Sequence, residues 1–430
     1  MGFYATHHWE NPHVSGIPRS DRRSGEYTTY TPSPLADIRL AISAETDRVL
    51  ASAERAVREL NRSTHKDLAL VARFLLRSEA IASSYIEGIA PSPRNVALAE
   101  LGQYEDVRGL SDAAQDVARN MTIVREAADA LAVQEWSEVA DLTSLQTSLL
   151  PHETELQGVR ATQNWIGGSR YHPLDAAHVP PPPDEVPGLL EDLVGYMNGP
   201  AHSAIIQAAL VHAQFETIHP FADGNGRVGR ALIHTVLTRR GLTEDAILPV
   251  SLVLATRQDE YIQGLQAFRF EGDAHSDAAL AAIDAWVATF GRAVQIAAQQ
   301  AMLIEQRIAD LRAQWEQDVA EARRREGRVR AARRDSALSA ILDGLPGTPV
   351  LTVATVTRIH QVTTTAAQAA LSALTEYEIL ERASIGRGRR AFISRDVLEL
   401  LARSERAMAS RDFDTAISPP VRVVPARPQG

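Results

Sequence analysis

The chain has 430 residues, of which 45% are hydrophobic and 23% charged, which is typical of a globular protein long enough for two or three domains. It contains no cysteine, which excludes disulfides and thiolate sites, and its net charge of −10 argues against attraction of the whole surface to nucleic acid. We find no apolar run of about 18 residues and no apolar leader, so we expect a cytoplasmic protein without membrane contact.

The first third of the chain predicts an arm followed by helices. Residues 1–35 are rich in small and polar residues without an apolar period, which predicts an extended N-terminal arm. Residues 36–130 predict an N-terminal helical region. Within it Ser83 and Glu87 are four residues apart and share a helix face, and Gly88 is placed to end the helix. The helix dipole disfavours a carboxylate in a last turn, so an arginine partner would explain Glu87.

Residues 131–300 predict a second helical unit that is interrupted once. Helices are expected near 128–150, 185–198, 204–216, 225–240, 262–268 and 280–290. Between the first two, Trp165 and Ile166 precede two glycines, which predicts a short β-hairpin, and the prolines 180–183 then enforce an extended connection.

The remaining chain predicts a linker and a small separate domain. One long polar helix is expected from Val294, with residues 301–334 as the linker. Residues 335–401 have the order helix, helix–turn–helix and two strands, which is that of a winged helix, and residues 402–430 predict a disordered tail. The wing arginines could contact DNA phosphates, namely Arg387, Arg389 and Arg390. This part has only slightly more arginines than acidic residues, so protein contacts or dimerisation explain it equally well.

The most informative stretch is the loop between residues 219 and 230. Pro220 pushes His219 out of the α region, just beyond a helix end. The backbone N–H groups of Gly224, Asn225 and Gly226 can converge on one bound anion at the start of the next helix, an arrangement called an anion nest. Arg227 and Arg230 follow on one face of that helix, where two cations are unfavourable unless an anion is bound.

These residue types predict transfer of a phosphoryl or nucleotidyl group. His219 can remove a proton from an attacking hydroxyl, and Asp223 suits Mg²⁺, which takes one or two carboxylates together with phosphate oxygens. Lys66 is the only lysine, so a Walker-type loop is excluded and arginines with backbone amides must hold the phosphates. Each residue alone would be interpreted as part of a turn or a solvated helix face, but their combination favours a transfer site.

The stretch from His219 to Arg230 resembles the Fic signature, H-x-F-x-[DE]-G-N-G-R-x-x-R, at every fixed position. The similarity extends over roughly residues 34–291. It implies that His219 is the general base, that Asp223 holds Mg²⁺, and that Arg227 and Arg230 contact the diphosphate and the γ-phosphate of ATP. The α- and β-phosphate ligands implied by the resemblance are Gly224, Asn225 and Gly226.

Two further segments are similar to parts of the same family. The run around Gln163, Asn164, Trp165 and Ile166 resembles the flap, which pairs with the main chain of the target protein. The run from Ser83 through Glu87 to Gly88 resembles the inhibitory motif [ST]-x-x-x-E-[GN]. That likeness implies that Glu87 pairs with Arg230 and denies it to the γ-phosphate, while Ser83 bonds near the same site.

We therefore expect a mainly all-α fold, a Fic-type helical bundle with a short hairpin flap and a C-terminal α+β winged helix. The expected activity is autoinhibited transfer of AMP from ATP to a Ser, Thr or Tyr hydroxyl of a target protein, with Mg²⁺. The alternatives are a transcription regulator on a Fic fold, removal of AMP, or transfer of another nucleotide. Homodimerisation is implied by family likeness only.

Overall fold

The computed structural model describes residues 1–12, 16–63, 68–199, 202–243, 247–327, 336–386 and 388–409. This part of the chain is mainly helical, as expected, and its strands form two small sheets. Short 3-10 turns connect some elements, at Arg19–Asp21, Leu35–Asp37 and Thr154–Leu156. No described helix is both long enough and apolar enough to cross a membrane.

The N-terminal arm is a paired hairpin rather than a single extended segment. β1 (Phe3–Trp9) and β2 (Gly25–Thr31) run antiparallel along their whole length. Threonine, tyrosine and histidine dominate both strands, and such residues fit a pleated, half-buried surface without any apolar period. The Tyr30 hydroxyl donates to the Phe270 carbonyl oxygen at 2.6 Å and so attaches the hairpin to the helical body.

The N-terminal helical region begins later than predicted, because Leu40 and Ile42 lie in an extended segment ahead of the first helix. Both side chains nevertheless pack against the core. The elements of this region are α1 (Ala44–Ser63), α2 (Leu68–Ile86), α3 (Pro93–Gly102), α4 (Asp112–Glu126) and a π-helical turn (Ala127–Leu131).

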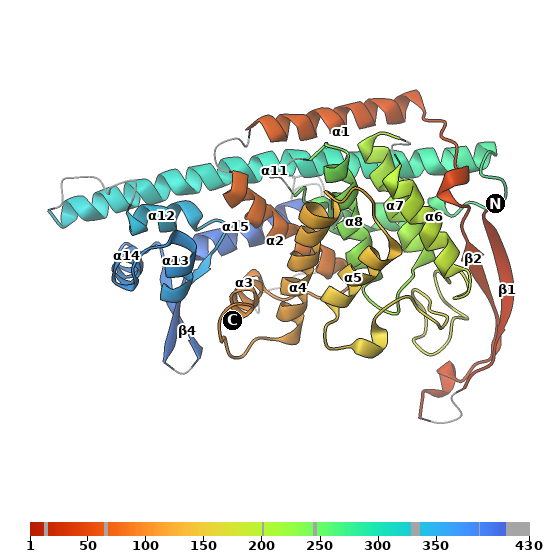
Figure 1. The fold of residues 1–430 in the computed structure, drawn as a ribbon, viewed down its shortest axis with the longest axis horizontal. Helices are drawn as coiled ribbons and strands as arrows, with labels where there is room; N and C mark the ends of the chain where they lie inside the picture. The colour runs from red at the N-terminus through yellow and green to blue at the C-terminus, as the bar shows by residue number, and fades with distance from the viewer. Residues whose placement is uncertain are drawn as a thin grey trace, which may run out of the picture.

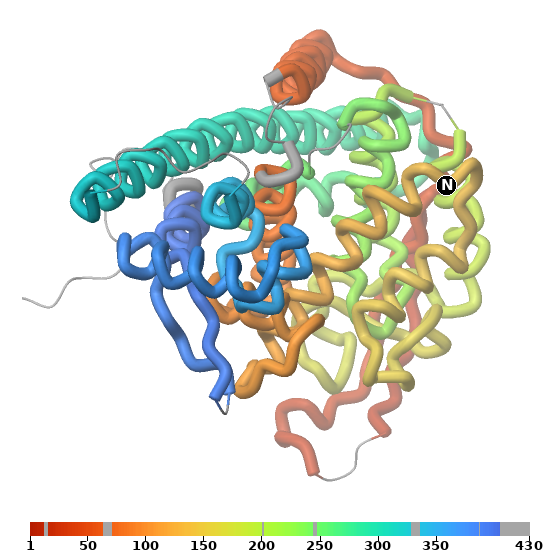
Figure 2. Tube along the Cα trace, turned by 60° about the vertical axis from the view of Figure 1, so that its left-hand side comes forward, coloured from red at the N-terminus to blue at the C-terminus, as the bar shows by residue number. Residues whose placement is uncertain are grey.

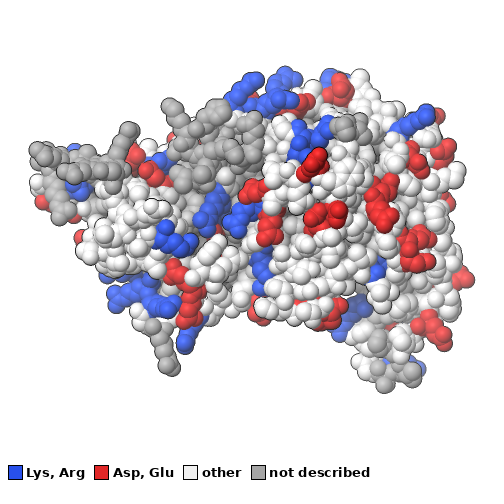
Figure 3. Space-filling view, in the orientation of Figure 1, with Lys and Arg blue, Asp and Glu red and all other residues white. Residues whose placement is uncertain are grey.

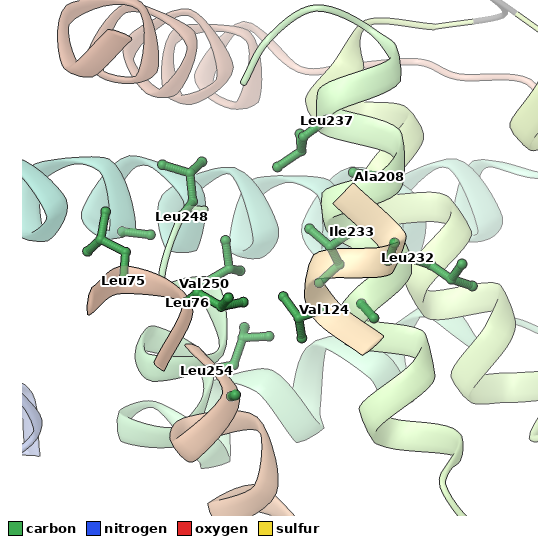
Figure 4. Close-up of a cluster of buried hydrophobic side chains, with 14 of the residues drawn as sticks. Leu75, Leu76, Val124, Ala208, Leu232, Ile233, Leu237, Leu248, Val250 and Leu254 are labelled. Carbon is green, nitrogen blue, oxygen red and sulfur yellow. The ribbon is translucent and has the colours of Figure 1, made fainter. Parts of the chain in front are cut away.

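The central unit packs six helices around one apolar core, and two of them face α2. These helices are α5 (Val139–Leu149), α6 (Val186–Asn198), α7 (Ala204–Ile218), α8 (Asn225–Arg239), α9 (Val250–Thr256) and α10 (Gln258–Phe268). Leu75 and Leu76 of α2 share a cluster with Ile233 of α8 and Leu254 of α9 (Figure 4). The apolar side chains therefore fix α2 against the helix that follows the predicted catalytic loop.

One continuous helix replaces the two that the sequence predicted. α11 runs from Asp277 to Arg325, so the expected boundary between a core and a linker helix at residue 300 falls inside it. α1 lies along α11, and the apolar residues of α11 face α1 and the core (Figures 1 and 2). The rest of the predicted linker, residues 328–334, lies outside the described residues.

The C-terminal unit contains the predicted helices and strands, together with one more strand and one more helix. β3, β5 and β4 form its sheet in that order. Its final helix extends to Ala409, so residues 402–409 of the predicted disordered tail are helical, and the rest of that tail, residues 410–430, lies outside the described part. Its elements are α12 (Ala337–Gly344), β3 (Val350–Leu351), α13 (Val353–His360), α14 (Thr364–Glu376), β4 (Glu381–Gly386), β5 (Arg389–Ile393) and α15 (Arg395–Ala409).

This unit is attached to α2 and α3 by buried polar contacts. The Arg77 side chain of α2 is fully buried, and its Nη2 donates to Glu100 of α3 at 2.7 Å and to the Gly347 carbonyl oxygen at 2.9 Å. Glu105 accepts hydrogen bonds from the hydroxyls of Thr352 and Thr355, at the start of α13. The same helix that carries Ser83 therefore also supports the C-terminal unit.

Candidate active site

The loop between α7 and α8 begins with a backbone turn at His219. The N–H of this residue still donates to the Phe215 carbonyl oxygen, but its φ of 47° and ψ of 62° are left-handed. Pro220 does exclude the α region, as predicted, yet His219 is left-handed rather than extended. A left-handed residue other than glycine is uncommon, and surrounding contacts have to hold it there.

Phe221 and Asn225 hold the loop in shape. The Phe221 ring is fully buried and packs against Phe215 at 5.9 Å between ring centroids. The Asn225 side chain accepts from the Phe221 N–H at 2.8 Å and donates to the Phe221 carbonyl oxygen at 2.8 Å. Its amide is thus engaged within the loop, which leaves its backbone N–H, near Gly224 and Gly226, as the group that could face a phosphate.

Two side-chain amides contact the His219 ring. Nδ2 of Asn164 lies 3.0 Å from Nδ1, and Nδ2 of Asn225 lies 3.2 Å from the same atom. Both amide groups also donate to the Phe221 carbonyl oxygen, which fixes their orientation. Nδ1 is therefore the acceptor in this arrangement, and the ring proton lies on Nε2.

Burial keeps His219 neutral. It lowers the pKa of the imidazole to about 4; nearby Glu87 acts in the opposite direction, and Arg160 and Arg269 lower it further. Arg160 also fixes the loop, because its guanidinium donates to the carbonyl oxygens of His219 at 3.0 Å and of Pro181 at 2.6 Å. A neutral imidazole at pH 7 has the protonation state that a general base needs.

Asp223 and Arg227 lie at the rim of the nest. The Asp223 side chain is 53% exposed, and its carboxylate accepts from the Gly224 N–H at 2.7 Å and from Arg227 at 3.4 Å. No group of three or more His, Asp or Glu side chains that could hold a metal occurs in the described part of the chain. A single accessible carboxylate beside a phosphate site still fits Mg²⁺, which commonly takes most of its ligands from phosphate and water.

Arg230 is held by the segment that carries Ser83 and Glu87. Its Nε donates to the Ser83 hydroxyl at 3.0 Å, and its Nη2 donates to the Ser83 carbonyl oxygen at 2.8 Å and to Glu87 Oε1 at 2.7 Å. The Arg230 side chain is only 2% exposed. Burial raises the pKa of Glu87, but Arg230 and Arg227 outweigh it and hold the pKa below its usual value.

Glu87 reaches this site from a position just beyond the C-terminal end of α2. The helix ends at Ile86, so Glu87 is the next residue rather than a member of the last turn. Gly88 adopts a φ of 80°, its N–H bonds to Tyr85 and the N–H of Ile89 bonds to Ser84, which is a Schellman ending. A Cβ at Gly226 would lie 2.0 Å from Glu87 Oε1, so only glycine lets this carboxylate approach the nest.

The predicted flap contains one bridge rather than a hairpin of two strands. Ile166 pairs with His178 through the hydrogen bonds of an isolated β-bridge. Gln163 donates to the Pro180 carbonyl oxygen at 3.0 Å and Trp165 to that of Ser169 at 2.7 Å. Prolines cannot donate to a ladder, which explains why pairing stops there. Asn164 is the flap residue that reaches the catalytic loop.

Two of the arginines assigned to the wing, Arg389 and Arg390, lie in β5, which pairs with β4 in the C-terminal unit and not in this site (Figure 1). Arg389 donates to the Asp106 carbonyl oxygen at 3.1 Å, Arg390 is exposed, and Arg387 lies outside the described residues. Figure 3 shows basic and acidic side chains side by side on this part of the visible face. Within the same unit, Arg395 pairs with Glu381 at 2.9 Å.

The sequence analysis missed two buried carboxyls beside the site. Glu216 is the only acidic residue of α7, and its isolation in an apolar helix was a usable signal. Glu79 of α2 accepts from the backbone N–H of Ser251 at 2.8 Å and lies 3.1 Å from His234 Nε2. Glu79 thereby joins α2 to α8 and α9, but nothing in its local sequence indicated such partners.

Comparison with known proteins identifies a domain within the chain. The Fic/DOC family model matches residues 137–237, which contain the loop and the predicted flap, so this part of the chain is a Fic/DOC domain. A crystal structure of a Fic family protein from Desulfovibrio desulfuricans aligns over 85% of this chain and 99% of that chain, with 20% identity and a TM-score of 0.51. At this identity the likeness shows a shared fold.

Two curated relatives are similar over shorter regions. A probable protein adenylyltransferase of Aquifex aeolicus is 36% identical over 87 residues, which are 20% of this chain and 25% of the relative. The protein adenylyltransferase Fic of Culex quinquefasciatus is 27% identical over 178 residues, which are 40% of this chain and 31% of the relative. The chain spans only about a quarter to a third of the length of these relatives.

Proposed function

We propose that the protein is an autoinhibited adenylyltransferase that moves AMP from ATP to a Ser, Thr or Tyr hydroxyl of a target protein. The observation that carries the proposal is the loop from His219 to Arg230, where a neutral histidine, a glycine-flanked helix N-terminus and two buried arginines lie together. This combination binds a polyphosphate and supplies a base, and it lies in the Fic/DOC domain. The adenylyltransferase names of the relatives agree with it.

In the proposed reaction, the target hydroxyl oxygen forms a bond to the α-phosphorus of ATP. The bond from that phosphorus to the bridging oxygen of the β-phosphate breaks, pyrophosphate leaves, and His219 takes the hydroxyl proton. Backbone amides at Gly224–Gly226 and the Arg227 guanidinium stabilise the charge that develops on the phosphates. Mg²⁺ bound at Asp223 would neutralise further phosphate charge.

The flap couples target binding to the base. Before His219 can accept a proton, an amide has to leave Nδ1 or the ring has to change tautomer, because Nδ1 faces Asn164 and Asn225. Asn164 belongs to the predicted flap, which resembles the segment that pairs with the main chain of the target protein. A target segment that pairs with the flap would displace Asn164 and so remove one of the two amides that occupy Nδ1, leaving the longer contact with Asn225.

The brake is the pairing of Arg230 with Glu87 and Ser83. While those bonds exist, Arg230 cannot bind the γ-phosphate, so ATP is held in a pose unsuited to transfer. Gly226 supports this interpretation, since its missing side chain admits the Glu87 carboxylate. Inhibition and nucleotide binding thus compete for one guanidinium.

For the C-terminal unit we propose a winged helix, on the order of α12 to α15 and the sheet order β3-β5-β4. The exposed polar face of α14 and the wing arginines Arg389 and Arg390 would be its contact surface. Contact with DNA must weaken steeply as salt rises, whereas contact with a protein or a second copy need not. A filter-binding titration over salt concentration tests the DNA assignment.

The test of the proposed reaction uses the Glu87→Gly variant with ATP, GTP, CTP and UTP, each labelled on the α-phosphate, and Mg²⁺. We expect label from ATP on the protein itself or on a mixed protein substrate, and no label with Glu87→Gly/His219→Ala. Transfer from another nucleotide in preference to ATP would reassign the substrate. No transfer from any of the four would refute the transferase function.

A further inference from the structure

Glu216 is a buried carboxyl for which the proposed mechanism has no use. It lies in the last turn of α7, three residues before His219. Its Oε1 atom is buried and has no hydrogen-bond partner in the described part of the structure. A Cβ at Gly229 would lie 2.6 Å from this oxygen, so Glu216 packs directly against α8 beside Arg230. An unpaired buried oxygen next to a guanidinium requires an explanation.

The groups that surround Glu216 define a small charged cluster. They come from α8, from the segments that follow α2 and α10, and from α10 itself, and one turn earlier α7 carries His212, whose pKa burial lowers to about 3. The surrounding groups are Arg230 of α8, Glu87 after α2, Tyr261 of α10 and Arg269 after α10. Burial raises the pKa of Glu216 to about 7, while Arg230 lowers it and Glu87 raises it.

We propose that Glu216 is the second partner of Arg230, a positioning residue that takes the guanidinium when Glu87 withdraws and holds it ready for the γ-phosphate. This inference rests on the proposed function. In the structure, Nε and Nη2 of Arg230 donate to Ser83 and Glu87. Once those bonds break, an arginine left without an anion in a buried site would be costly, and Glu216 is a buried carboxyl that already packs against α8 at Gly229, the neighbour of Arg230.

Opening of the brake then releases a proton. With Glu87 paired to Arg230, protonation of Glu216 avoids placing a buried negative charge near a second carboxylate. When Glu87 leaves, its influence on Glu216 disappears, the pKa of Glu216 falls, and the carboxyl ionises against Arg230. In the closed form Glu87 is paired with Arg230, and in the open form it is not. Because the closed form holds one proton more than the open form, a rise in pH favours the open form until Glu216 is ionised in both forms.

The activity test compares initial self-labelling rates of the wild type and Glu87→Gly at pH 6 to 8. We expect the ratio of wild type to Glu87→Gly to rise by up to about tenfold between pH 6 and 7 and to level off above that. Glu216→Gln should make this ratio low and independent of pH, and in the Glu87→Gly background it should raise the KM for ATP more than it changes kcat. Glu191→Gln, on the exposed face of α6, is the matched control and should behave as its parent.

An infrared measurement tests the same inference without activity. With ¹³C-carboxyl glutamate, the wild type at pH 6.5 should show a protonated carboxyl band that Glu216→Gln lacks and that Glu87→Gly loses. The inference is overturned if the wild type has no such band, if Glu87→Gly keeps it unchanged, or if Glu216→Gln retains the pH-dependent ratio. If no variant transfers AMP, the proposed function fails, and the infrared bands still decide the role of Glu216.

Discussion

The proposed brake depends on the hydrogen bonds that one side chain, Arg230, donates. It donates twice to Ser83 and once to Glu87, and its guanidinium is almost entirely buried. Keeping 99% of the molecules closed requires about 2.7 kcal/mol, half of what a full switch needs. Hydrogen bonds to charged groups contribute about 1.5–3 kcal/mol each, so this small set of contacts suffices.

Ser83→Ala should release the brake in part. The variant loses the bond from Arg230 Nε to the Ser83 hydroxyl but keeps the bonds to the Ser83 carbonyl oxygen and to Glu87. A loss of about 1.5 kcal/mol, the lower end of the range for a hydrogen bond to a charged group, would raise self-labelling roughly tenfold. Ser144→Ala on the exposed face of α5 serves as the control, and equal rates in the two variants would argue against a role for the Ser83 hydroxyl.

The pH profile of the Glu87→Gly variant should reflect the buried state of His219. Its pKa is depressed to about 4, so the base form exists above that pH and is lost as the pH falls through it. We expect a kcat that stays level from pH 6 to 8. A loss of half the activity near pH 6.5, the ordinary histidine value, would mean that the ring is solvated in the active state.

At the scale of elements, α2 links the brake to two other parts of the protein. Its end presents Ser83 and Glu87, its middle binds α8 and α9 through Glu79, and its first half anchors the C-terminal unit through Arg77. The apolar contacts of α2 with α8 and α9 complete this attachment (Figure 4). Glu87 is therefore held beside Arg230 by the residue that directly follows a helix packed against α8 and α9, rather than by a long loop.

Removal of Arg77 should destabilise this arrangement strongly. Arg77→Ala would leave Glu100 without its fully buried partner, and breaking a buried pair costs about 3–5 kcal/mol. Urea denaturation should reveal a lower free energy of unfolding. Arg73→Ala is the matched comparison, because Arg73 also pairs with Glu100 but its side chain is 36% exposed, and it should have the smaller effect. An equal effect of both would contradict the importance of burial.

The sequence predicted the catalytic loop because its chemistry is local. His219, the glycines and both arginines fall within twelve residues. The helix end at Gly88 indicated only that Glu87 has an arginine partner, and the resemblance to the Fic inhibitory motif implied that this partner is Arg230, which the structure pairs with it. The hairpin of residues 3–31 was missed because its strands have no apolar period. Glu79, Arg160 and Glu216 act through partners distant in sequence, which only the packing of α2, α7 and α8 brings together.

At the scale of the whole molecule, buried neutral histidines should make stability depend on pH. Burial lowers the pKa of His212 to about 3 and that of His219 to about 4, and it lowers that of His178 as well. The unfolded chain binds these protons near pH 6.5, so stability is complete above that value and falls as the pH drops toward 4. The raised pKa of Glu216 has the opposite effect, because between about pH 7 and 4.5 it makes the folded protein more stable as the pH falls, but Glu216 is a single group.

The check is the free energy of unfolding in urea at pH 5 and at pH 7. We expect it to be lower at pH 5, and the difference to shrink in His212→Gln, which removes one buried imidazole and can still bond to the Tyr261 hydroxyl. Higher stability at pH 5 would mean that the carboxyl dominates.

The central claim is that the loop from His219 to Arg230 transfers AMP and that Glu87 restrains it. The most direct measurement is the intact mass of the wild type, Glu87→Gly and Glu87→Gly/His219→Ala after incubation with ATP and Mg²⁺. We predict that Glu87→Gly gains the mass of AMP, that the wild type gains little, and that the double variant gains none. An unmodified Glu87→Gly protein, or equal modification of the double variant, would contradict the account.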